Sequence, residues 1–134
     1  MTKERLRKYV TLRQEVLNLE ARVREKEHEM VSLRSPSLEG LPTAKGKTSS
    51  PVEDAVASLV DLQAKYVRRL EVMYREQSAI EEAVASLSDS VERQLMRARY
   101  LDGQTWEEVC ETIGYSWSQV HRIHARALQN IADK

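Results

Sequence analysis

Apolar residues recur at alternating steps of three and four along the first part of the chain. A sustained alternation of this kind lines up side chains on one stripe of a helix and is typical of a coiled-coil seam. Only Lys26 interrupts the stripe, and we expect a coiled-coil helix over residues 1–34. The seam positions are Tyr9, Leu12, Val16, Leu19, Val23, Lys26, Met30 and Leu33.

The same alternation returns later and predicts a second coiled-coil helix over residues 53–87. Gln63 and Gln77 are its polar members, and polar seam residues favour a specified register over maximal stability. The seam positions are Val56, Leu59, Gln63, Tyr66, Leu70, Met73, Gln77, Ile80, Val84 and Leu87.

Helix-breaking residues gather between the two seams. All three prolines and two of the four glycines lie between residues 36 and 51, so residues 35–52 are expected to form a flexible connector. A connector of this length allows the two helices to pair as an antiparallel hairpin. It equally allows each helix to pair with a second copy of the chain, and the sequence does not choose between the two.

The pattern changes after Leu87, where three capping signatures follow one another. Asp89, Thr105 and Ser116 each stand three residues before a Glu or Gln, as at the start of a helix. Gly103 and Gly114 fall where helix ends favour a left-handed residue. Helices are therefore expected near 90–102, 106–113 and 117–132. A short helix, a tight turn with Gly and a longer helix form a helix-turn-helix, so we expect an all-α chain whose residues 88–134 bind DNA.

Within this segment, the stretch from Thr105 to Val109 and the run from Tyr115 to Leu128 resemble region 4 of sigma-70-type sigma factors. The shared features are a Thr-x-Glu-Glu-Val start, a Ser or Thr cap after the turn, and an Ile-x-Ala-basic-Ala-Leu run. The resemblance implies a helix-turn-helix that binds duplex DNA, as region 4 binds the promoter −35 element.

The whole chain resembles a family of small phage and prophage proteins of Gram-positive bacteria, which join helical segments to a sigma-like helix-turn-helix. The connector of that family resembles the stretch Ser35-Pro36-Ser37-Leu38-Glu39-Gly40-Leu41-Pro42. Related phage proteins of the ArpU and RinA type are regarded as late transcription regulators. The resemblance implies a regulator of phage transcription in the cytoplasm of the bacterial host.

Carried over residue by residue, the base contacts of sigma region 4 fall on Trp117, Ser118 and Arg122, where sigma factors typically have Arg, Glu and Gln. None is kept, so the usual −35 sequence is not the implied target. Arg122 suits guanine and Gln119 suits adenine. The hydroxyls of Ser116 and Ser118 suit phosphate, as do His121 and Arg126, and Trp117 suits a sugar or a thymine methyl group. The predicted DNA-binding residues are Ser116, Trp117, Ser118, Gln119, His121, Arg122 and Arg126.

Charge supports modest DNA binding by a single domain. The chain has 21 basic and 21 acidic residues, so no whole-chain field favours DNA. Residues 117–132 nevertheless contain Arg122, Arg126 and His121 and no acid. We expect weak, salt-sensitive binding that gains affinity from a homo-oligomer, with a dimer favoured.

Other chemistries find little support. No phosphate loop, Ser-His-Asp set or paired carboxylates appear, so we expect no catalytic residue and no cofactor. The single Cys110 is expected in the core, and His121 with His124 lacks the further ligands of a metal site. His124 and Trp106 are expected to pack against the core. Neither a signal peptide nor an apolar run long enough to cross a membrane is visible.

Two alternatives stay open at this point. A small terminase subunit also combines a helix-turn-helix with coiled-coil assembly, but it forms large rings that start DNA packaging. A protein-interaction module, with RNA polymerase as its partner, fits the missing sigma base contacts. In that case Arg122→Ala would leave function intact.

Overall fold

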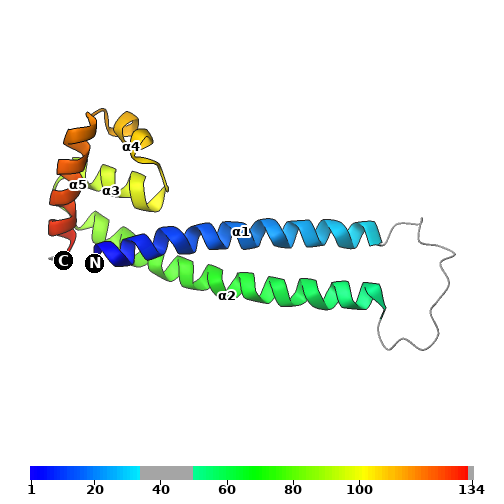
Figure 1. The fold of residues 1–134 in the computed structure, drawn as a ribbon. Helices are drawn as coiled ribbons and strands as arrows, with labels where there is room; N and C mark the ends of the chain where they lie inside the picture. Colours follow the sequence, from blue (N-terminus) through cyan, green and yellow to red (C-terminus); the bar gives the residue numbers. More distant parts are fainter. Residues whose placement is uncertain (34–49, 133–134) are drawn as a thin grey trace. The chain divides into compact units, whose positions relative to one another are not determined.

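The computed structural model describes residues 1–33 and 50–132, and every element in these two ranges is a helix (Figure 1). The expected all-α class is therefore confirmed. The connector was expected over residues 35–52, and its residues 35–49 lie outside the described part of the chain. The elements are α1 (Lys3–Leu33), α2 (Pro51–Ala85), α3 (Ser90–Met96), the π-helical turn η2 (Arg97–Leu101), α4 (Trp106–Ile113) and α5 (Trp117–Ala132).

The chain divides into two compact units. The first contains Met1–Gln14 and Val72–Lys134, and the second contains Glu15–Glu71.

Helix α2 begins two residues earlier than its seam predicts. The backbone N–H of Glu53 donates to Oγ of Ser50 over 3.1 Å, and the N–H of Ser50 donates to Oε2 of Glu53 over 3.4 Å. This reciprocal capping box sets the helix start at Pro51, which needs no hydrogen-bond partner for its nitrogen at the first helical position.

In the second unit, α1 and α2 lie side by side in opposite directions (Figure 1). An NH2 of Arg69 lies 2.7 Å from Oε2 of Glu15, and further along α1 the amide of Gln63 donates to Glu27 over 3.4 Å. A small apolar cluster holds this pair of helices together. Its buried members are Leu19, Val23 and Leu62, with Leu59 and Tyr66 packed against them.

The expected seam holds better on α1 than on α2. Val16, Leu19, Val23 and Met30 are buried, as their spacing predicts. On α2, Leu62 is buried although it was not assigned to the seam, whereas the seam residue Val56 is 39% exposed. The seam residues Ile80 and Val84 are nevertheless buried, and Leu59 and Tyr66 pack against the small cluster, so most of the expected seam of α2 faces inward.

The first unit joins the start of α1 and the end of α2 to the C-terminal helices in one core. Leu6 and Tyr9 of α1 belong to the same buried cluster as Ile80 and Val84 of α2. Arg5 of α1 also binds Glu76 of α2 with two nitrogens, over 2.8 and 3.2 Å. The cluster continues through the C-terminal helices with Leu87, Leu95, Met96, Ala98, Tyr100, Leu101, Val109, Val120, Ile123, Ala127 and Ile131.

The helix ends of the C-terminal segment match the capping signatures. Oδ1 of Asp89 accepts from the N–H groups of Glu92 and Val91, and these two bonds lower the pKa of the Asp89 carboxyl. Thr105 caps α4 by accepting from the N–H of Glu108. Gly114 ends α4 with φ +73°, a left-handed conformation that side-chain-bearing residues rarely adopt. These caps fix the α4–turn–α5 arrangement of a helix-turn-helix.

Candidate nucleic-acid interface

Helix α5 has an inner and an outer face. Its inner residues pack into the core of the first unit and fix the orientation of the helix. They are Val120, Ile123, His124, Ala127 and Ile131. The outer face carries Ser118, Arg122, Ala125 and Gln129, all exposed at steps of four and three. No acidic residue occurs on α5, so this outer face carries positive charge and no negative charge.

The N-terminus of α5 is closed by a reciprocal capping box. Oε1 of Gln119 accepts from the backbone N–H of Ser116 over 3.2 Å and from its hydroxyl over 3.0 Å. The N–H of Gln119 donates back to Oγ of Ser116 over 3.4 Å. Both residues were predicted to contact DNA. In this structure the Gln119 carbonyl oxygen is already in use, and its amide NH2 is the group left to point outward.

Arg122 lies on the exposed side of α5, next to a hollow of about 330 Å³ that Tyr115 and Gln119 also line. No hydrogen bond or ion pair holds its guanidinium within the part of the chain that the structure describes. All five of its N–H donors are therefore available to a ligand.

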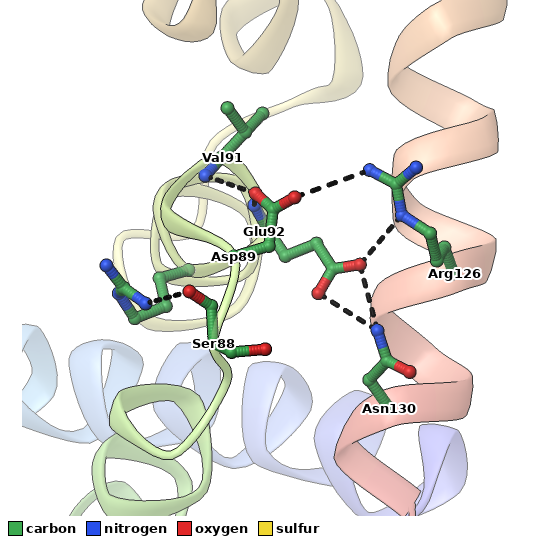
Figure 2. Close-up of polar contacts among 7 residues, drawn as sticks. Ser88, Asp89, Val91, Glu92, Arg126 and Asn130 are labelled. Carbon is green, nitrogen blue, oxygen red and sulfur yellow. Dashed lines mark hydrogen bonds and ion pairs between the residues drawn. The ribbon is translucent and has the colours of Figure 1, made fainter.

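Arg126 lies one turn further along α5 and is bound within its own domain (Figure 2). Its Nε donates to Oε1 of Glu92 over 2.9 Å, and an NH2 lies 3.8 Å from Oδ2 of Asp89. The Asn130 amide donates to both carboxylate oxygens of Glu92, over 3.0 and 3.1 Å. Glu92 is 1% exposed, so its charge is buried and balanced by these donors. Contact of Arg126 with DNA stays a prediction.

Trp117 and His121 form part of a row of aromatic rings along one edge of α5. The His121 ring lies 4.7 Å from the rings of both Trp117 and Trp106. Trp117 is 55% exposed, whereas Trp106 is partly buried against the core. The expectation that Trp106 packs against the core is confirmed. Nε2 of His121 is buried and has no hydrogen-bond partner among the described residues.

His124 is buried, which confirms the expectation that it packs against the core. Its Nε2 and the hydroxyl of Tyr100 are hydrogen-bonded over 2.6 Å. Burial lowers the pKa of His124 to about 4, with smaller electrostatic contributions from Lys3, His121, Arg99 and Arg7. Burial also raises the pKa of the Tyr100 hydroxyl. The pair is therefore neutral near pH 7.

Sequence reasoning missed three features of this unit. The buried Glu92 was assigned only to a capping signature, and its partners Arg126 and Asn130 lie 34 and 38 residues away. Tyr100, the partner of His124, was not singled out at all. Leu6 was not placed in any core. Leu6 lies three residues before Tyr9. Extending the seam of α1 back to Leu6 would therefore have predicted its burial.

No helix in residues 1–33 or 50–132 is both long and apolar enough to cross a membrane. In the same ranges, no group of three or more His, Cys, Asp or Glu side chains gathers as a metal site would require.

Comparison with known proteins bears on the C-terminal segment. Residues 83–133 match the family model described as Sigma-70, region 4. No curated protein and no solved structure matches the chain. The matched stretch includes α3, η2, α4 and α5, which are the elements with the helix-turn-helix geometry described above. Sigma-70 region 4 is a DNA-binding domain that also interacts with RNA polymerase, and it is not catalytic. The C-terminal segment of this chain is therefore a Sigma-70 region 4-like helix-turn-helix unit.

Proposed function

We propose that the protein is a sequence-specific DNA-binding regulator of phage transcription, in which α5 enters the major groove. The observation that carries the proposal is the free guanidinium of Arg122 on the acid-free outer face of α5, in a segment that matches Sigma-70 region 4. An Arg in this position binds guanine O6 and N7 with two parallel hydrogen bonds.

The neighbouring residues divide between positioning and recognition. The hydroxyl of Ser118 holds a phosphate, and the positive end of the α5 dipole favours the anion there. Trp117 is exposed and covers a sugar or a thymine methyl group. Gln119 offers its amide NH2 while its oxygen stays in the capping box with Ser116. Arg126 and His121 lie at the edges of the outer face, where the phosphates of the two strands pass.

Dimerisation supplies the affinity that one such unit lacks. An apolar strip on α2 in the second unit faces solvent, and it comprises Val52, Val56, Val60 and Val67, which are 38–54% exposed. Charges along this part of α2 are ordered, with only acids between Glu53 and Asp61 and only bases between Lys65 and Arg69. Two copies of α2 that run antiparallel would place the acidic half of each against the basic half of the other. In such a pair Val60 packs on Val67 of the partner copy and Asp61 faces the partner's Arg68.

RNA polymerase is a second partner within the same proposal, since sigma region 4 units interact with it. The sigma residues that contact the −35 bases are replaced here by Trp117, Ser118 and Arg122, so the proposed DNA target differs from the usual promoter element. The protein then regulates transcription by bringing RNA polymerase to a different DNA site, or by keeping RNA polymerase away from a DNA site.

The test is binding of the purified chain to fragments of the phage genome around its gene, at two salt concentrations, with the mass in solution determined alongside. A preference for one fragment that survives the higher salt supports the regulator, and twice the chain mass supports the dimer. Equal binding to every fragment contradicts the proposed DNA-binding regulator and favours a polymerase-binding module. A ring of eight or more copies contradicts it in favour of a terminase-like protein.

A further inference from the structure

The first unit contains a cavity of about 520 Å³ that the proposed DNA contact of Arg122 does not use. Its walls come from the start of α1 and from the C-terminal helices, both within the first unit. The cationic side chains that line it are Lys3, Arg7 and Arg99, and the aromatic ones include Tyr100, Trp106 and His121. A volume of this size is typical of sites for small molecules.

The charge in the cavity is one-sided. The lining contains three cationic side chains and no carboxylate. No hydrogen bond or ion pair engages the side chain of Lys3 or Arg7 within the described ranges. The same cations act on buried His124, which stays neutral near pH 7. Like charges gathered around a partly buried space repel one another, and a bound anion removes that repulsion.

The cavity also offers flat surfaces and an unused hydrogen-bonding atom. The guanidinium of Arg99 lies 4.5 Å from the centre of the Trp106 ring, and one of its NH groups donates to the carbonyl of Gln104. These two contacts hold the Arg99 guanidinium over the indole of Trp106. Nε2 of His121, also in the lining, is buried without a partner among the described residues. A buried polar atom without a partner costs free energy, which a ligand would recover.

We propose that this cavity binds a small anion that carries both a phosphate group and a flat aromatic ring, the chemistry of a nucleotide. Arg7 and Lys3 bind the phosphate oxygens, and the ring lies against Trp106, which lines the cavity and is only partly buried. Nε2 of His121 completes the site with one hydrogen bond to the ligand. Because the ligand contacts α1 and the C-terminal helices together, its binding stabilises the first unit as a whole. Among the proposed DNA-contact residues, this site shares only His121.

The experiment is calorimetric titration of the full-length chain, without magnesium, with three probes. These are ADP, which has ring and phosphates, inorganic pyrophosphate, which has no ring, and adenosine, which has no charge. We expect ADP to bind most tightly, pyrophosphate more weakly and adenosine weakest. Arg7→Ala should weaken ADP binding by about tenfold or more, because it removes a charged hydrogen-bond donor.

Lys8→Ala is the matched control, since it removes one positive charge from the neighbouring position of α1, which does not line the cavity. It should change ADP binding by less than about twofold if charge acts locally. Equal losses in both variants, or no binding of any probe at millimolar concentration, would overturn the proposal. The proposal would also be overturned if the wild type does not bind ADP and the Arg7→Ala variant loses binding to duplex DNA. In that case the cavity would bind a phosphate of DNA.

Discussion

Nε of Arg126 on α5 lies 2.9 Å from Oε1 of Glu92 on α3, and this contact joins the candidate DNA-binding helix to the rest of its domain (Figure 2). The carboxylate is buried, while the Arg126 side chain is 57% exposed. The pair therefore has one end in the core and one end in water. A residue that was predicted to contact DNA phosphates also holds two helices of its own domain together.

Replacing Arg126 by alanine should lower the free energy of unfolding by about 2–3 kcal/mol. Glu92 would keep a buried charge with only the Asn130 amide to bind it, and an unbalanced buried charge is strongly destabilising. Urea unfolding followed by circular dichroism measures the change. Arg122→Ala is the control from the same helix, and it should change stability by less than about 0.5 kcal/mol because its side chain is exposed. Equal stability of the two variants would contradict the role of Arg126.

Stability should fall as the pH falls from 7.5 to 5, because of His124. Its folded pKa of about 4 lies below its unfolded value of 6.5, so the unfolded chain binds the proton more readily in this range. The stabilisation from a neutral His124 is present above pH 6.5 and is lost towards pH 4. The loss between pH 7.5 and 5 should be about 2 kcal/mol.

His124→Gln isolates this effect, since glutamine keeps a hydrogen-bonding side chain next to Tyr100 but does not titrate. The difference in the free energy of unfolding between the wild type and this variant should shrink by about 2 kcal/mol as the pH falls from 7.5 to 5. A difference that is constant with pH would show that His124 is not held neutral by burial.

The proposed dimer predicts a charge-swap result on α2. Asp61→Arg should produce monomers, because two bases would then face each other at each of the two symmetric positions. The double variant Asp61→Arg with Arg68→Asp should restore the dimer. Light scattering after size-exclusion chromatography measures both masses. A monomer in the wild type, or a single variant that stays dimeric, would contradict this interface.

The exposed valines provide a second test of the same surface. Val60→Glu with Val67→Glu should abolish the dimer without unfolding the chain, since both side chains are about half exposed in the single copy. Val31→Glu on α1 is the matched control, because Val31 is 69% exposed and lies outside the strip. It should leave the mass unchanged.

The features that sequence predicted correctly are local ones. Thr105, Gly114 and Ser116 act within a few residues of themselves, so their spacing was enough to place the start and end of α4 and the start of α5. For these residues the physical cause is a hydrogen bond or a backbone conformation that the residue brings with it. The buried seam of α1 was predictable from its apolar spacing.

The features that sequence did not predict depend on distant partners. Glu92 carries the signature of a capping box, but its side chain turns inward because Arg126 and Asn130 meet it from α5. Leu62 is buried because it packs with Leu19 and Val23 of α1, beside the seam residues Leu59 and Tyr66. The predicted contacts of the α5 residues with DNA are of this second kind, since they depend on a partner outside the chain.

Specific DNA binding by Arg122 is the central claim, and Arg122→Lys tests it most directly. Lysine keeps the charge but lacks the two parallel donors that fit guanine. With the preferred genome fragment and an unrelated duplex titrated side by side, the variant should lose about 1–3 kcal/mol on the preferred fragment alone. Its binding to the unrelated duplex and its salt dependence should match the wild type. An unchanged preference for the fragment in both Arg122→Lys and Arg122→Ala would contradict the claim that α5 recognises DNA through this residue.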